Sequence, residues 1–378
     1  MKSRERVKNA YEFKAVDRTP LDMTFTISAY NNTVRHINKG FKEATSCNVW
    51  QLTSPAKEFL EYMGADFFYL PLKAPSAQPP FILGCDEYTT EFGLIWRKNV
   101  MSAGYIDYEP VNAPYKDFSL ADLKNLRLPD PDDEAIYAGL GEQAEDLYFN
   151  SGLALVGSFG GSTFTQASML RGIEQWFMDL LLDPEFAEEL MRKLCGYYKA
   201  LYCNALEICG KYLTCLRTDN DDYGDQNGLM ISRDTFGKVI KPHVADYYST
   251  IKKKFHEYNP DGKLLKHSCG DVYGLIEDFI EIGIDVLNPV QPRTRGMTAE
   301  KLIPAFGGKI AFHGAIDTQY LLPQGTPEEV KQAVKKAISD FTLPGGGGYV
   351  VAPAHHFQPD VPAENIIAMS EAVKETGG

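Results

Sequence analysis

The chain contains 378 residues, of which 44% are hydrophobic, and it carries a formal net charge of −13 at pH 7. This length suits either two or three small domains or one α/β barrel, and the hydrophobic fraction is high enough for a large core. The negative charge and the lack of a Lys/Arg-rich stripe argue against nucleic acids and anionic membranes as partners.

The N-terminal residues MKSRERVKNAYEFKAVD lack the apolar stretch of a signal peptide, and no apolar run approaches the roughly 18 residues of a membrane span. Seven cysteines are an odd number, which argues against a disulfide framework. We therefore expect a soluble, cytoplasmic protein that has no membrane partner.

Short apolar segments alternate with longer amphipathic segments, most regularly beyond residue 150, and this alternation is typical of βα units. Two amphipathic segments have N-terminal signals of helices: Asp183-Pro184 begins one, and Thr326 and Glu329 have capping-box spacing in the other. We predict a single (β/α)8 TIM barrel over residues 1–378. Its eight predicted strands are 20–25, 65–71, 153–159, 213–219, 263–269, 285–291, 309–315 and 349–356.

Residues 81–113 interrupt this alternation with a hairpin-like pattern, and we predict that they form a β-hairpin insertion over the barrel mouth. The apolar side chains of Phe92, Ile95, Trp96 and Tyr105 are expected to form a lid there.

In a (β/α)8 barrel the active site lies at the carboxyl ends of the strands. Polar residues follow five predicted strands: Asp219, Asp221 and Asp222; His267 and Cys269; Asn288 and Gln291; His313 and Asp317; His355 and His356. The predicted catalytic residues are Asp222, Asp221, His313 and Tyr320. The predicted substrate-binding residues are Asp219, Asn288, Gln291, Asp317 and Trp96.

His267 and Cys269 are two residues apart at the end of a predicted strand, so their side chains should point the same way. An imidazole and a thiolate in this arrangement can share a Zn²⁺ ion. The predicted third ligand is His355, with His356 as the alternative. The competing interpretation is a hydrogen-bonded histidine beside an ordinary buried cysteine.

The segment TDNDDYGDQNG, residues 218–228, places four aspartates close together. Like charges at short range raise the pKa of their neighbours, which suits acid-base catalysis or recognition of a cationic or N–H-rich ligand. A solvated acidic loop is the alternative.

Several segments resemble the uroporphyrinogen decarboxylase superfamily, notably RERVKNAYEFKAVDRTPLD, LRGIEQWFMDLLLDPEFAEELM, HSCGDVYGLIEDFIEIGIDVLNPVQ, KIAFHGAIDTQYLL and APAHHFQPDVPAENI. The superfamily includes the decarboxylase of haem biosynthesis and the methylcobamide-dependent methyltransferases. The resemblance covers nearly the whole chain, less clearly residues 75–115. It implies a (β/α)8 barrel whose active site lies at the C-terminal mouth.

The resemblance to the decarboxylases is incomplete at the first strand. The decarboxylases carry an Arg-Gln-Ala-Gly-Arg-Tyr run there, whose arginines bind the substrate's carboxylates, whereas residues 23–32 read MTFTISAYNN. The methyltransferases hold zinc with a His-x-Cys motif and a downstream cysteine. His267 and Cys269 match this motif, but the downstream position is His355, which also matches a histidine of the decarboxylases. Asp222 or Asp221 corresponds to the aspartate that binds pyrrole N–H groups in the decarboxylases.

The resulting hypothesis is a zinc-dependent methyltransferase that moves a methyl group between a small, largely uncharged substrate (an ether, amine or thiol) and a corrinoid (cobalamin). Because no Asp-x-His-x-x-Gly motif is present, a separate corrinoid protein should carry that cofactor. Zinc would act as a Lewis acid on a thiol or on a leaving group. The alternatives are a cofactor-free decarboxylase of a tetrapyrrole or smaller acid and a non-catalytic, ligand-binding barrel. The resemblance also implies that a homodimer is one expected assembly.

Overall fold

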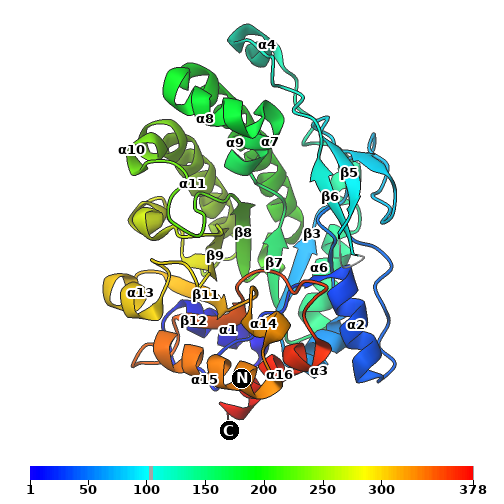
Figure 1. The fold of residues 1–378 in the computed structure, drawn as a ribbon, viewed down its shortest axis with the longest axis vertical. Helices are drawn as coiled ribbons and strands as arrows, with labels where there is room; N and C mark the ends of the chain where they lie inside the picture. The colour runs from blue at the N-terminus through cyan, green and yellow to red at the C-terminus, as the bar shows by residue number, and fades with distance from the viewer. Residues whose placement is uncertain (102–104, 378) are drawn as a thin grey trace.

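A curled parallel β-sheet forms the centre of the computed structural model, which describes residues 1–101 and 105–377 (Figure 1). Its seven strands follow the order β12-β11-β10-β9-β8-β7-β3. Each strand therefore pairs with the strand that was predicted just before or just after it along the chain. The strands are β3 (Phe67–Pro71), β7 (Ala154–Ser158), β8 (Cys215–Asn220), β9 (Lys263–His267), β10 (Val286–Val290), β11 (Ala311–Ile316) and β12 (Tyr349–Pro353).

The predicted strand 20–25 is represented only by a short segment between the two edges of this sheet. The Asp22 amide donates to the Val351 carbonyl of β12 at 2.8 Å, and the Leu21 carbonyl accepts from the amide of Asp66, the residue before β3, also at 2.8 Å. Pro20 has no N–H to extend this pairing. The segment thus bridges β12 and β3 and takes the place of the first strand in this TIM-barrel-like fold.

Helices surround the sheet (Figure 1). They are α1 (Ser3–Tyr11), α2 (Ile27–Ile37), α3 (Lys57–Met63), α4 (Leu120–Asn125), α5 (Glu134–Tyr137), α6 (Leu140–Asn150), α7 (Phe164–Arg171), α8 (Ile173–Leu182), α9 (Pro184–Cys209), α10 (Arg233–Thr235), α11 (Lys241–Tyr258), α12 (Ile276–Glu281), α13 (Ala299–Phe306), α14 (Leu321–Gln324), α15 (Pro327–Phe341) and α16 (Ala363–Glu375). Three single-turn elements, η1 (Gly210–Tyr212), η2 (Phe236–Ile240) and η3 (Tyr273–Leu275), complete the set. None of these described helices is both long enough and apolar enough to cross a bilayer.

The helix starts read from the sequence are confirmed. The Asp183 side chain accepts from the Phe186 amide at the start of α9, and Thr326 and Glu329 form a complete capping box at the start of α15. Satisfying the free N–H groups of a first turn in this way contributes about 1 kcal/mol per cap.

One end of the barrel is filled by apolar side chains and covered by α1. Val7 and Tyr11 of α1 are buried in a cluster with interior residues of all seven strands, among them Phe67, Val156 and Leu265. This packing closes the amino-terminal end of the barrel, so that a ligand can enter only from the opposite end, where the strands finish.

Part of the segment 81–113 forms a separate three-stranded antiparallel sheet of β4 (Glu87–Thr89), β5 (Ile95–Val100) and β6 (Ile106–Pro110); its positions 102–104 lie outside the described residues. Phe92 packs edge-to-face against Tyr197 of α9, with ring centroids 5.4 Å apart. Trp96 is buried against Trp50, with ring centroids 4.6 Å apart. The short strands β1 (Phe25–Thr26) and β2 (Leu52–Thr53) pair with each other nearby in the chain.

Candidate functional site

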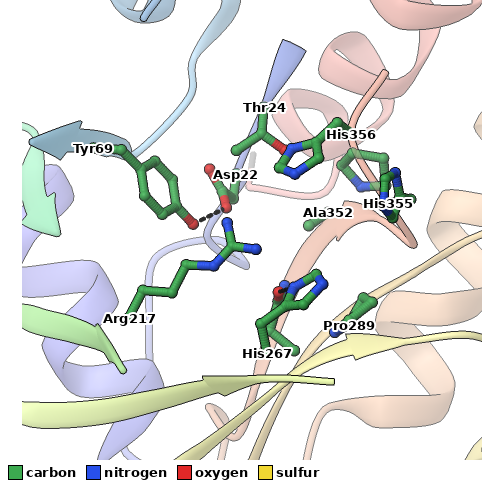
Figure 2. Close-up of a pocket in the computed structure, with 11 residues that line it drawn as sticks. Asp22, Thr24, Tyr69, Arg217, His267, Pro289, Ala352, His355 and His356 are labelled. Carbon is green, nitrogen blue, oxygen red and sulfur yellow. Dashed lines mark hydrogen bonds between the residues drawn. The ribbon is translucent and has the colours of Figure 1, made fainter. Parts of the chain in front are cut away.

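A narrow cavity lies where the strands end, and side chains from six parts of the barrel line it (Figure 2). Its free volume is about 10 Å³, which is the space of about one water molecule. Asp22 and Thr24 come from the segment that bridges β12 and β3. The other side chains discussed below are Tyr69 of β3, Arg217 of β8, His267 of β9, Asn288 of β10, and His355 and His356 after β12.

His267 is the last residue of β9, and the neighbouring strand holds its ring. Its Nδ1 lies 2.8 Å from the amide oxygen of Asn288, so Nδ1 carries the hydrogen and Nε2 keeps its lone pair. Burial lowers the pKa of His267 well below its ordinary value, and the nearby Arg217 lowers it further. The imidazole is therefore neutral, and its Nε2 is available to a metal ion.

Cys269 lies in the turn after β9, because the strand ends at His267 instead of continuing to residue 269 as predicted. The turn nevertheless brings the Cys269 Sγ to 3.4 Å from the His267 Nε2. Gly270, which follows, has φ +82°, and its Cα packs directly on the backbone of Gly224. This glycine-to-glycine contact joins the turn after β9 to the acidic segment after β8.

Asp222 is the acidic residue that this contact brings to His267 and Cys269. Its Oδ1 accepts from the Cys269 amide at 2.7 Å. One donor atom from each of Asp222, His267 and Cys269 lies within 4.8 Å of the other two. Ligands of tetrahedral zinc are about 3.3–3.8 Å apart, given bonds of about 2.0–2.3 Å, so a small adjustment of side chains would suffice. Nitrogen, sulfur and carboxylate oxygen form a donor set that fits Zn²⁺.

Burial shifts the pKa values of both acidic groups beside His267 upwards. Burial raises the pKa of the Cys269 thiol well above its ordinary value, and the carboxylate of Asp222 raises it further. Burial also raises the pKa of Asp222 itself.

His355, the predicted third ligand, is not part of this three-residue group, although it lines the same cavity. Its ring centroid lies 6.4 Å from that of His267, and burial lowers its pKa to about 4. The ring of His356 lies 4.9 Å from that of His355, and the buried His356 Nδ1 has no partner within the described part of the chain. Asp222, which the sequence suggested for the substrate, thus lies beside the predicted metal ligands.

Two other acidic residues of the 218–228 segment, Asp219 and Asp221, have partners inside the protein. Asp219 is fully buried and forms a 2.6 Å ion pair with Lys266, and it also accepts a hydrogen bond from Tyr248. Burial raises the pKa of Asp219 to about 6 in spite of the opposing charge of Lys266. Asp221 accepts from the Thr163 hydroxyl at 2.7 Å and so anchors the start of α7. Neither carboxylate lines the cavity.

Asn288 and Gln291 support the turn and its histidine. Asn288 holds His267, as described above, and the Gln291 Oε1 accepts from the Gly270 amide at 2.9 Å. Only Asn288 also lines the cavity. These contacts position the predicted metal ligand His267 and the turn that carries Cys269; the substrate contact of Asn288 and Gln291 remains a prediction.

The remaining predicted residues lie apart from the cavity. His313 is fully buried beneath it and bonds to the Asp22 Oδ2 at 2.9 Å. Tyr320 is exposed and stacks under Arg293, in an open surface hollow that Asp317 also lines. Trp96 belongs to the small antiparallel sheet, and no described residue of the 81–113 segment lines the cavity. The functional roles proposed for these residues remain predictions.

Three polar residues that line the cavity were not identified from the sequence: Asp22, Tyr69 and Arg217. The Tyr69 hydroxyl donates to the Asp22 Oδ2 at 2.6 Å (Figure 2). Both lie in apolar strand patterns, where a single polar residue carries little signal. Arg217 was more conspicuous, because a charged residue inside the buried strand CLRTDN is unusual.

Comparison with known proteins gives one family and one fold. The model of the uroporphyrinogen decarboxylase (URO-D) family matches residues 78–376. The uroporphyrinogen decarboxylase of Pseudoalteromonas atlantica (strain T6c / ATCC BAA-1087) is 26% identical over 267 residues, which are 68% of each chain. The match to that of Danio rerio is 26% identical and spans 36% of this chain and 35% of the relative. The match to the uroporphyrinogen decarboxylase of Legionella pneumophila (strain Corby) is 29% identical and spans 39% of this chain and 41% of the relative. The chain thus covers about two fifths or less of these last two relatives.

Among solved structures, a methyltransferase from Methanosarcina mazei has a TM-score of 0.69 with this chain at 18% identity, and the match covers 99% of both chains. At this identity the likeness describes the fold. The family model, by contrast, spans more than three quarters of the sequence and includes every strand from β7 to β12. The chain belongs to the uroporphyrinogen decarboxylase (URO-D) family.

Proposed function

We propose that this enzyme is a zinc-dependent methyltransferase that transfers a methyl group between a small methylated substrate and a corrinoid bound to a partner protein. The observation that carries the proposal is the donor set of His267, Cys269 and Asp222, whose donor atoms lie within 4.8 Å of one another. The fold that the chain shares with a methyltransferase from Methanosarcina mazei is in keeping with this assignment.

In this proposal the chain's own residues prepare the site. Asn288 fixes the tautomer of His267, and Gly270 holds Cys269 against Asp222. His355 is the nearest further imidazole among the cavity residues and is the proposed fourth ligand. When bound here, Zn²⁺ would supply Lewis acidity for activating a thiol or a leaving group.

At the inner end of the cavity, Tyr69 and His313 hold the Asp22 carboxylate, and Tyr11 contacts His313 in turn. The Asp22 Oδ2 accepts from Tyr69 and lies 2.9 Å from the His313 Nε2, while the Tyr11 hydroxyl lies 3.3 Å from the His313 Nδ1. His313 would therefore act on chemistry through Asp22, as a positioning residue.

Metal analysis and a methyl-transfer assay test the proposal together. We expect about one Zn²⁺ per chain in the purified protein, and methylation of a reduced corrinoid protein by at least one member of a panel of methyl ethers, methylamines and methyl thioethers. Cys269→Ser and His267→Ala should each release zinc and abolish transfer while the protein stays folded. Cys203→Ser, a half-buried cysteine of α9 outside the site, is the matched control and should retain both properties.

The competing function is decarboxylation, the activity in the names of the curated relatives. A porphyrinogen substrate would need several arginines for its carboxylates, whereas a single arginine is found among the cavity residues described. Incubation with uroporphyrinogen should therefore release no carbon dioxide. Efficient decarboxylation by metal-free protein would refute the methyltransferase assignment.

A further inference from the structure

Arg217 is a buried arginine that faces the cavity without a partner. Its residue is 7% exposed, and its Nε makes no hydrogen bond. Across residues 1–101 and 105–377, no carboxylate lies within 4.0 Å of its guanidinium nitrogens, and no side chain or carbonyl accepts from them. Figure 2 shows the guanidinium projecting between Asp22 and His267 into the space that both residues line.

An arginine in this position is costly unless something in the cavity pairs with it. A guanidinium carries a positive charge, and burying a charge without a partner costs several kcal/mol. The nearby histidines supply no negative charge. Asp22 is the acidic residue among those that line the cavity, and its Oδ2 is already occupied by Tyr69 and His313.

From this geometry we infer that Arg217 binds a carboxylate of the small substrate. The inference rests on the proposed function, because it specifies the class of substrate that the same cavity takes. A guanidinium presents parallel N–H donors that match the two oxygens of a carboxylate. The free volume of about 10 Å³ holds about one water molecule, so a ligand here must be small, and the side chains that line the cavity must move to admit it. The buried Asp22 Oδ1, which has no partner among the described residues, adds an acceptor for an N–H or O–H of the same ligand.

The inference changes the substrate expected from the sequence. The absence of arginines at residues 23–32 indicated a largely uncharged molecule. The one arginine of the cavity instead indicates a substrate with one carboxylate. The methyl-bearing atom of that substrate would have to reach the group formed by His267, Cys269 and Asp222. Small methoxy acids and N-methyl amino acids belong to this class.

Calorimetric binding to the purified protein tests the inference without any turnover. The matched probes are methoxyacetate and 2-methoxyethanol, which differ only in carboxylate against hydroxymethyl. We expect methoxyacetate to bind at least tenfold more tightly. Arg217→Met should abolish this preference, Arg217→Lys should retain part of it, and Arg127→Gln, at an exposed arginine far along the chain from the cavity residues, should leave it unchanged.

Thermal unfolding of Arg217→Met distinguishes a ligand-binding arginine from a structural one. If Arg217 awaits a ligand, the variant should unfold at the same temperature as the wild type or higher. A clear loss of stability would make Arg217 the counter-ion of Asp22 and overturn the inference. Equal binding of the two probes, or tighter binding of inorganic phosphate than of methoxyacetate, would also overturn it.

The outcomes separate this inference from the proposed function. Carboxylate binding that depends on Arg217, in a protein that transfers no methyl group, would refute the methyltransferase assignment but support the carboxylate site at Arg217. Methyl transfer from neutral donors that is unaffected by Arg217→Met would support the methyltransferase assignment but refute the carboxylate site at Arg217.

Discussion

The contact between Gly270 and Gly224 should be essential for the candidate metal site. Gly270 has φ +82°, where a residue with a side chain costs about 1–2 kcal/mol. A Cβ at Gly270 would lie 2.6 Å from the Asp225 nitrogen and still closer to the Gly224 carbonyl. Ordinary contact begins at 3.4 Å, so the two turns would have to separate by at least the 0.8 Å difference. Overpacking of this kind costs about 1–3 kcal/mol more.

Gly270→Ala should therefore lower the free energy of unfolding by about 2–5 kcal/mol and, by moving Cys269 away from Asp222, should weaken zinc binding. Gly308→Ala is the matched control: Gly308 has φ +80°, but a Cβ there would meet nothing within 4 Å. It should cost only the backbone term and leave zinc binding intact. Urea unfolding and metal titration of both variants measure the difference, and equal effects from both would refute the reasoning.

Three further predictions concern side chains. Asp222→Asn should reduce zinc affinity, because the carboxylate lies beside His267. Unchanged metal content together with impaired turnover would show that Asp222 acts on the substrate instead of binding the metal. Asn288→Leu should lower zinc affinity about 10–100-fold through loss of the bond to His267, and an unchanged affinity in metal titration would show that the ring is held by other contacts. Lys266→Met should destabilise the fold by about 3–5 kcal/mol at pH 8 by leaving Asp219 buried without its partner. Burial already raises the pKa of Asp219 to about 6, so the folded variant takes up a proton more readily than the unfolded chain and the loss should shrink as the pH falls. A pH-independent loss in urea unfolding would contradict this explanation.

The acidic segment after β8 shows how one sequence motif divides into separate tasks. Asp219 pairs with Lys266 inside the barrel wall, Asp221 anchors the start of α7, and Asp222 faces the turn that carries Cys269. The first two carboxylates stabilise the framework of the site. Asp222 alone among the three belongs to the group with His267 and Cys269, whereas the sequence predicted roles in catalysis or substrate binding for all three.

The sequence alone determined the βα alternation, the positions of seven strands and the starts of α9 and α15. These features depend on local patterns: apolar periodicity, capping residues and the spacing of turns. The first strand was the exception, because whether Pro20–Asp22 pairs with its neighbours depends on the two edge strands that curl towards it. The His-x-Cys pair could likewise be recognised, since the two residues are only two positions apart, at the end of β9 and in the turn that follows it.

Only the tertiary structure decided which distant residues complete the site. Asp222 reaches His267 and Cys269 because two glycines, in different turns, allow their backbones to touch. Arg217 faces the cavity without a partner in the described part of the chain because the neighbouring strands offer it no carboxylate, and no local pattern around CLRTDN contains that information. Such contacts join residues far apart in the chain, so they arise from the closure of the barrel and from the packing of its turns.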